Sequence, residues 1–318
     1  MLCYLAVRTP FGPHVTPLVY VADGGAVWTT TSRRSVKARA WRADPSVAGL
    51  IRGSDRTVTF RGSVRTYDLL DPSSWPAAAR CGPRIIRAAT RFTLKNARFF
   101  TGYAIDARQV PFAWTPPGRV FAEIRPDSGW ILRSDGRPEE GWGRWSRPVG
   151  TTPKYRASFA PGVGEASMER HTPPVVREAV GGSGDGVLAV EVDGRLTVLP
   201  VRWRWAAGRG AVDAVLPAGA HDLAGPGSSF PSALVVDHAS RWRASEMRGI
   251  LVQGTARAFS PNVTRRGRTA LLDRMARVAG EYGSDDLAMV RIEPSRTVWW
   301  AGWTSGTVVP PSKGRADR

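Results

Sequence analysis

Residues 57–67 read TVTFRGSVRTY, and this stretch decides the fold because a second stretch of the chain matches it. Residues 249–259 read GILVQGTARAF and align with it, so that Gly62 corresponds to Gly254. Both stretches are rich in β-branched and aromatic residues and predict β-strands. The same structural unit is therefore expected once in each half of the chain.

A second match supports the repeat. Residues 120–131, VFAEIRPDSGWI, align with residues 288–299, AMVRIEPSRTVW, and Pro126 corresponds to Pro294. In each half a helix is expected between the two matched strands. Similarity over so long a period indicates an internal duplication, and two copies indicate two similar β-units rather than a solenoid.

The predicted elements define a mainly β protein with a few helices. Antiparallel strands with so few helices favour a small closed barrel in each half. Two copies in one chain would form an intrachain pseudo-dimer with a pseudo-two-fold axis. The strands are expected at 16–23, 26–32, 47–51, 57–68, 119–132, 186–205 (two strands around a DG turn), 232–237, 249–259 and 287–300. The helices are expected at 35–45, at 84–96 with Ile85, Ile86, Ala89 and Phe92 as the apolar face, and at 269–283.

The repeat also predicts the domain boundaries. The first barrel is expected at 1–139 and the second at 181–310. Residues 140–180 are rich in Gly, Pro, Arg and Ser without periodicity, which indicates a linker. Residues 311–318 form a basic tail.

Composition limits the classes of partner. The chain has 318 residues, 42% of them apolar, and a formal net charge of +18 that comes mostly from arginine. This charge favours anionic partners such as phosphate cofactors or acidic metabolites. The arginines are scattered through every segment, so we expect a basic surface without specific nucleic-acid binding. Two cysteines and four separated histidines indicate neither a disulfide framework nor a metal site. The absence of a long apolar run or a signal peptide predicts a cytoplasmic protein that does not enter a membrane.

Residues 29–41, TTTSRRSVKARAW, carry the pattern of a phosphate site. The start of a helix offers unpaired N–H groups and a favourable dipole to an anion. The hydroxyls of Thr31 and Ser35 add donors, Arg33 or Arg34 can bind two oxygens at once, and Lys37 adds a point charge. The alternative interpretation is a solvated basic turn in which these hydroxyls cap the helix.

The region around this motif resembles the pyridoxamine 5'-phosphate oxidase-like, FMN-binding split-barrel superfamily. Members have a strand with a turn similar to GPHVTP (12–17), then a hairpin, a Thr/Ser-rich strand end and Ser-x-Lys at the start of a helix. That helix ends at a proline step similar to ADPSV (43–47), and Gly62 matches the strand glycine. The resemblance covers about residues 2–132 well and 186–305 more loosely. It implies two tandem split barrels.

The resemblance also implies a cofactor site. The phosphate of FMN would contact Thr31, Arg33, Ser35 and Lys37, and its ring would lie near residues 14–17 at the junction of the barrels. Trp242 is added because it follows a strand end and is flanked by arginines. The expected cofactor-binding residues are His14, Val15, Thr16, Pro17, Thr30, Thr31, Ser32, Arg33, Ser35, Lys37 and Trp242.

The second copy departs from this pattern. Residues 214–237, AVLPAGAHDLAGPGSSFPSALVVD, contain no Ser-x-Lys. We therefore expect a degenerate second barrel and one FMN per chain. The end of the chain also departs from the substrate segment of pyridoxamine 5'-phosphate oxidases, so a B6 vitamer is not expected as the substrate.

These features predict an FMN-dependent oxidoreductase that acts on an unidentified small molecule, anionic or aromatic, with NAD(P)H as a candidate electron donor. No catalytic side chain is assigned. The alternatives are a deazaflavin-dependent reductase of the same fold and a non-catalytic protein that binds flavin or haem, with His14 as the candidate axial ligand. The pseudo-dimer could associate further into a homo-oligomer.

Overall fold

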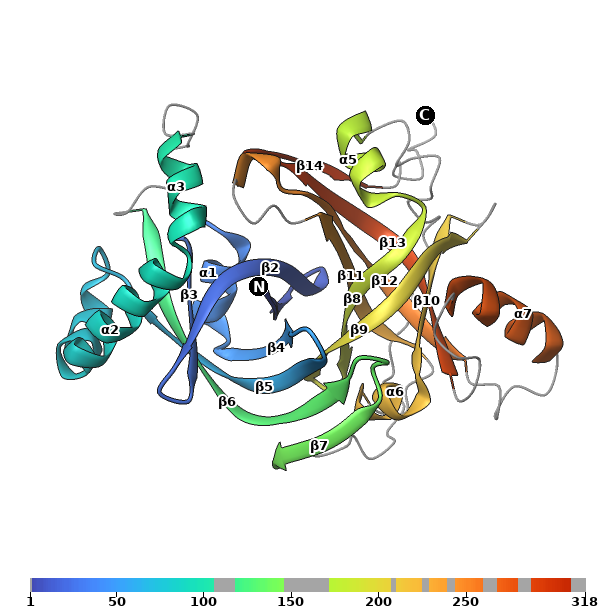
Figure 1. Ribbon diagram of the computed structural model, residues 1–318, viewed down its shortest axis with the longest axis horizontal. Coiled ribbons are helices and arrows are strands. Elements are labelled where there is room, and N and C mark those ends of the chain that lie inside the picture. The colour runs from blue at the N-terminus through green and yellow to red at the C-terminus, as the bar shows by residue number, and fades with distance from the viewer. Residues whose placement is uncertain are drawn as a thin grey trace, which may run out of the picture.

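The computed structural model describes residues 2–105, 118–145, 172–206, 210–224, 229–238, 244–259, 268–279 and 287–309. Its two halves each form a barrel of antiparallel strands (Figure 1). The mainly β architecture with two closed six-strand barrels confirms the predicted fold class.

The first barrel closes through hydrogen bonds between β3 and β6, and β7 extends the sheet beyond β6. Its strands, in the order in which they are neighbours, are β3 (Ala26–Ser32), β2 (Gly12–Asp23), β1 (Leu2–Thr9), β4 (Ser46–Arg52), β5 (Arg56–Tyr67), β6 (Arg119–Arg133) and β7 (Pro138–Gly143).

The second barrel repeats this order, closes between β10 and β13, and carries β14 beside β13. Each strand of the second barrel therefore has a counterpart seven strands earlier in the chain. The strands are β10 (Ala211–Pro217), β9 (Arg195–Ala206), β8 (Ser183–Val192), β11 (Phe230–His238), β12 (Arg248–Phe259), β13 (Leu287–Ala301) and β14 (Thr304–Val308).

The matched glycines and prolines occupy the same place in both barrels. Gly62 of β5 lies opposite Pro126 of β6, and Gly254 of β12 lies opposite Pro294 of β13. In both pairs the register shifts immediately before the glycine, as at a β-bulge. The repeat seen in the sequence is therefore a repeat of a specific irregularity in strand pairing.

Tight hairpins join the strands where the sequence predicts them. Gly24 and Gly25, between β2 and β3, have φ values of 58° and 72°. Asp193 and Gly194, between β8 and β9, have φ values of 49° and 70°. Two consecutive positive φ angles are characteristic of the type I′ turn that matches strand twist.

In both halves at least one helix lies between the two matched strands, as the repeat predicts: α2 and α3 between β5 and β6, and α7 between β12 and β13. In Figure 1 α2 and α3 cover the outside of the first barrel and α7 covers the outside of the second. The described helices are α1 (Val36–Ala43), η1 (Pro72–Ser74), α2 (Trp75–Lys95), α3 (Ala97–Ile105), α5 (Pro174–Val180), α6 (Ala218–Ala224), η3 (Ala244–Glu246) and α7 (Arg268–Ala279).

The predicted apolar face of α2 is wrong at one position. Ile86 is 68% exposed, whereas Ala88 and Phe92 are buried. Arg87 and Arg91 of α2 form ion pairs with the buried Asp23. The helix therefore packs on the barrel through Ala88 and Phe92, and Ile86 faces away from it.

The two barrels share an apolar core and reciprocal hydrogen bonds. The shared core includes Val15 of β2 and Leu251 of β12, both fully buried. Arg61 of β5 donates a hydrogen bond to the carbonyl of Leu196 in β9 over 3.0 Å. Gln253 of β12 donates one to the carbonyl of Pro13 in β2 over 2.7 Å.

These two hydrogen bonds are counterparts of each other. Arg61 and Gln253 each directly precede the bulge glycine of their barrel. Pro13 and Leu196 each lie one residue after the start of β2 or β9. In a two-fold arrangement each half makes the same contact with the other, as these two hydrogen bonds do. This supports the expected pseudo-two-fold relation between the barrels.

The segment between the barrels is described only in part. Strand β7 runs to Gly143 and α5 occupies Pro174–Val180, so both lie partly or wholly within the range expected as linker. The domain boundaries stay a prediction, and residues 311–318 lie outside the described residues. None of the described helices combines the length and apolar character needed to span a bilayer.

Candidate functional site

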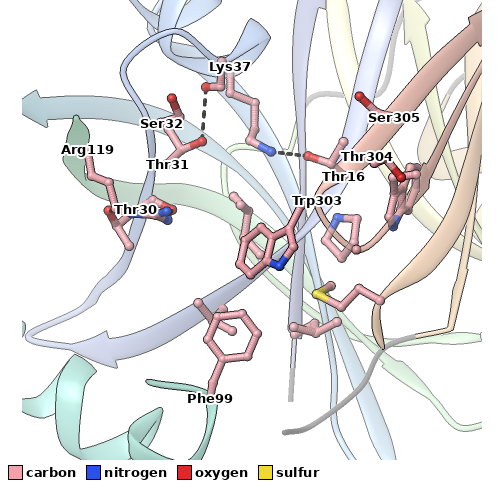
Figure 2. A pocket seen from close by; sticks show the side chains of 18 residues that line it. Thr16, Thr30, Thr31, Ser32, Lys37, Phe99, Arg119, Trp303, Thr304 and Ser305 are labelled. Atoms are coloured by element: carbon pink, nitrogen blue, oxygen red, sulfur yellow. Dashed lines mark hydrogen bonds between the residues drawn. The ribbon is translucent and has the colours of Figure 1, made fainter. Parts of the chain in front are cut away.

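A cavity of about 250 Å³ lies where the first barrel meets the β13–β14 hairpin of the second (Figure 2). One end is polar and is formed by the first barrel. The other end is largely apolar and receives side chains from both barrels. The lining residues are Leu2, Thr16, Pro17, Leu18, Val19, Thr30, Thr31, Ser32, Ser35, Lys37, Phe99, Arg119, Met247, Trp300, Gly302, Trp303, Thr304 and Ser305.

The polar end is built around the start of α1. Ser35 is the N-cap of this helix, and its Oγ accepts a hydrogen bond from the backbone N–H of Ala38 over 3.1 Å. Thr31, at the end of β3, donates its hydroxyl to the same Oγ over 3.1 Å. The strand end and the helix start are thereby held together. The first N–H groups of a helix have no partner within it, so this junction offers donors to an anion.

Lys37 is the central cation of the polar end. It lies in the first turn of α1, it is buried, and its ammonium donates a hydrogen bond to the hydroxyl of Thr16 in β2 (Figure 2). Within the described part of the chain no carboxylate lies within ion-pair distance of it. Burial and then the nearby Arg119 lower the pKa of Lys37 from 10.5 to about 7. The side chain of Lys37 is therefore not exposed on a solvated turn.

Arg119 brings a second cation to the same end. It begins β6 and reaches across to Thr30 of β3, where its Nε donates to the Thr30 hydroxyl and its Nη2 to the Thr30 carbonyl, both over 3.1 Å. The strand pairing of β3 with β6, which closes the barrel, places Arg119 there, because it lies opposite Ser32. Two positive charges thus face one small space.

The apolar end is formed by rings and alkyl chains from four elements and one turn. Leu2 and Val19 are partners across β1 and β2, and Phe99 comes from α3. Trp300 and Trp303 come from β13 and its turn into β14. In the view of Figure 2 the ring of Trp303 lies between the polar cluster around Lys37 and the ring of Phe99. Such a surface suits one face of a planar aromatic ligand.

The structure brings most of the expected cofactor-binding residues to this one cavity. Seven of them line it, all from β2, β3 and the start of α1. They are Thr16, Pro17, Thr30, Thr31, Ser32, Ser35 and Lys37.

The remaining four expected residues are placed elsewhere or not described. His14 is buried outside the lining, and burial lowers its pKa to about 3, with Lys37 and Arg296 contributing. Val15 lies in the core between the barrels. Arg33 forms an ion pair with the buried Asp68 and does not line the cavity. Trp242 lies outside the described residues.

Several lining residues were not expected from the sequence. Arg119, Phe99, Met247, Trp300 and Trp303 lie far in sequence from the motif at 29–41. Trp300 and Trp303 lie in a tryptophan-rich segment at 299–303, and this composition could have indicated an aromatic wall of a binding site. Arg119 could have been found only from the closure of β3 on β6.

The counterpart of the polar end in the second barrel is apolar. The register of β10 on β13 matches that of β3 on β6, with Val212 opposite Ile292 as Val27 is opposite Ile124. Counting from these pairs, the strand end carries Val215, Leu216 and Pro217 where the first barrel has Thr30, Thr31 and Ser32. Leu216 is buried in the second barrel's core together with Leu132, which lies near the end of β6.

Parts of the chain are similar to solved structures of other proteins. No family model and no curated protein matches the sequence. Solved structures that match include a pyridoxamine 5'-phosphate oxidase-related, FMN-binding protein from Nostoc punctiforme, which is 19% identical with a TM-score of 0.33, over 44% of this chain and 78% of that one. An F420 reductase is 22% identical with a TM-score of 0.25, over 40% and 86%. The haem storage protein of Vibrio cholerae is 15% identical with a TM-score of 0.26, over 42% and 84%.

Each of these matches spans less than half of this chain. The strand order described above, in which six antiparallel strands close and a seventh extends the sheet, occurs twice. It fits the tandem split-barrel arrangement that the sequence resemblance implied.

Proposed function

We propose that this cavity binds FMN and that the protein is an FMN-dependent oxidoreductase that acts on a small molecule. The observation that carries the proposal is the pair of cations at the polar end. Lys37 is buried beside Arg119 without a carboxylate partner among the described residues. A buried, unneutralised charge is costly, and a bound anion would remove that cost.

The positive charge of the polar end of the cavity, called the cradle below, favours a phosphate monoester. Such a group carries about −1.5 to −2 charges near neutral pH. It would balance the positive charge of this end and accept hydrogen bonds from the hydroxyls of Thr30 and Ser35 and from the start of α1, while the Thr31 hydroxyl donates to Ser35. A ligand without a phosphate would leave the charge of the buried Lys37 without a phosphate to neutralise it.

The apolar end suits the ring system of a flavin. Trp303, Phe99 and Met247 offer flat or polarisable surfaces, and the β13–β14 hairpin excludes water from one side. The bound flavin would supply the redox chemistry, accepting a hydride from a donor such as NAD(P)H or from the substrate. The chain's own residues would bind the phosphate, orient the ring and restrict access of water. An anionic or aromatic substrate would fit the lining.

We expect FMN to bind at least about a hundred-fold more tightly than riboflavin, which has the same ring but no phosphate. Losing charge-assisted contacts to two cations should cost about 3 kcal/mol or more of binding free energy. Fluorescence titration of the flavin-free protein with each compound measures the difference. Equal affinities would show that the cradle does not read the phosphate and would overturn the assignment.

We expect one FMN per chain. In the described part of the chain, hydroxyls and cations gather at this junction in the first barrel only, whereas the counterpart positions carry Val215, Leu216 and Pro217. Titration at protein concentrations well above the dissociation constant should saturate at one equivalent. Saturation at two equivalents would show that the second barrel has kept a cofactor site.

The absorbance spectrum of the purified protein separates FMN from the alternative cofactors, because flavin, deazaflavin and haem have distinct bands. A haem spectrum would contradict the proposal directly. Of the described residues that line the cavity, none is a histidine, and the candidate axial ligand His14 is buried outside the lining.

A further inference from the structure

A second cavity, of about 480 Å³, lies at the pseudo-symmetric counterpart of the flavin cavity. The pair Leu2–Val19 lines the flavin cavity, and its counterpart across β8 and β9 is the pair Asp185–Arg202, which lines the second cavity. Pro200 takes the place of Pro17. The second cavity therefore lies at the same place in the second copy of the repeat, but different side chains line it.

The positions that form the apolar end of the first cavity carry charged side chains in the second cavity. Met247, one residue before β12, corresponds to Asp55, one residue before β5. The turn after β13 carries Trp303, whereas the turn after β6 carries Asp135. A planar apolar ring would find no stacking surface at these positions. The cavity instead suits a hydrophilic ligand.

The inner end of the second cavity is closed. A side chain added at Gly136, in the β6–β7 turn, would meet the ring of Pro217 at 3.3 Å, so this turn packs against the end of β10. The corresponding space in the first barrel is the cradle formed by Thr31, Ser32 and Ser35. A ligand of the second cavity must therefore be bound near its mouth, where the arginines are.

The lining of the second cavity contains one more arginine than aspartate: Arg52, Arg56, Arg133 and Arg202 against Asp55, Asp135 and Asp185. Arg202 pairs with Asp185 over 3.1 Å, but its Nε is buried without an acceptor in the described part of the chain. Arg52 uses Nη2 to donate to the carbonyl of Gly186 over 2.6 Å. Among the described residues no carboxylate lies within ion-pair distance of Arg133. Arg52 has none within that distance either, but it lies over the ring of Tyr4 and interacts electrostatically with Asp237.

We propose that this second cavity binds a small multivalent oxyanion, a molecule with several carboxylate or phosphate groups, through Arg52, Arg133 and Arg202. Guanidinium groups bind such oxygens two at a time, so three of them around one mouth favour a ligand with at least two anionic groups. The site is separate from the flavin cavity and does not depend on flavin being bound.

The test uses citrate and inorganic phosphate as probes of the full-length protein, measured by isothermal titration calorimetry in about 150 mM salt, which screens the general positive charge. We expect saturable binding of at least one probe. Arg133→Gln should weaken it at least tenfold, because Arg133 is exposed and its loss should not disturb folding. Asp185→Asn should tighten it several-fold, because Asp185 competes for Arg202 and is itself 57% exposed.

Matched controls carry the same charge changes away from the cavity. Arg80→Gln on α2 and Asp273→Asn on α7 both alter exposed residues and should leave probe affinity within about twofold. Absence of saturable binding up to about 10 mM of either probe would overturn the proposal. So would an Arg133→Gln variant that behaves like Arg80→Gln, which would indicate adventitious binding to a basic surface. Flavin titration of the same variants should be unchanged, so that failure here is distinguishable from failure of the FMN assignment.

Discussion

Replacing Lys37 with methionine should make the flavin-free protein more stable and at the same time weaken FMN binding by about ten- to a hundred-fold. The two effects have one cause. The ammonium of Lys37 is buried in the first turn of α1, where the positive end of the helix dipole also disfavours a cation. Methionine fills a similar volume without a charge, so folding no longer buries a cation. The phosphate of FMN, however, loses a charge-assisted contact of about 1.5–3 kcal/mol.

The stability gain should depend on pH in a defined direction. The pKa of Lys37 is about 7 in the folded protein and 10.5 when unperturbed. Between these values the unfolded chain binds the extra proton, so the stability of the parent protein rises with pH. The advantage of Lys37→Met is therefore largest below pH 7, on the order of a few kcal/mol. It should shrink as the pH rises and vanish above about 10.5.

Thermal unfolding of flavin-free parent and variant at pH 6 and pH 9 checks this expectation, with flavin titration as the second readout. Lys95→Met is the matched control. Lys95 lies over the ring of Tyr20, at 3.5 Å from its centroid, and it does not line the cavity. Its replacement should leave FMN affinity unchanged and should not raise the melting temperature. A Lys37→Met variant that is less stable and binds FMN normally would mean that Lys37 is a structural residue.

The part of the site that sequence could predict is the part that is local. Thr31, Ser35 and Lys37 fall within seven residues, and the start of a helix brings such residues together without help from the rest of the chain. The strand end, the cap and the cation could therefore be inferred from the motif alone. The structure shows that Ser35 is the N-cap, because its Oγ accepts the hydrogen bond from the backbone N–H of Ala38.

Burial and long-range neighbours could not be predicted, because they depend on tertiary packing. Lys37 is covered because β2 passes beside it and the hairpin after β13 forms the opposite wall. Arg119 reaches the cradle only because β6 closes the barrel on β3. Arg33, which the motif offered as a phosphate ligand, is held by Asp68 from the segment after β5. Each of these outcomes joins residues more than twenty positions apart.

The duplication explains why the fold was more predictable than the site. Two copies of a strand pair preserved Gly62 and Gly254, whose role is in the backbone and is the same in both barrels. The same two copies diverged where the first barrel lines its cavity, as Thr31 and its buried counterpart Leu216 show. Positions that are the same in both copies therefore indicate the fold, and positions that differ indicate where one barrel has a candidate binding site that the other lacks.

The largest loss of stability should come from adding a single methyl group at either bulge glycine. A Cβ at Gly62 would lie 2.8 Å from the carbonyl carbon of Arg125 and 2.9 Å from the Cα of Pro126. A Cβ at Gly254 would lie 2.8 Å from the carbonyl carbon of Glu293 and 3.0 Å from the Cα of Pro294. These are backbone atoms of a paired strand, so they cannot move aside as a flexible side chain would.

We therefore expect Gly62→Ala and Gly254→Ala each to lower the free energy of unfolding by about 3 kcal/mol or more, well above the effect of an ordinary surface substitution. Denaturant titration measures both. Gly182→Ala is the control, because a Cβ there would have no heavy atom within 4 Å among the described residues. The shared apolar core should make the two barrels unfold together, so the two variants should lose similar amounts of stability. If only one of them is strongly destabilised, the two strand irregularities are not equivalent. The structural correspondence between the two barrels, and with it the correspondence between the two cavities, then fails.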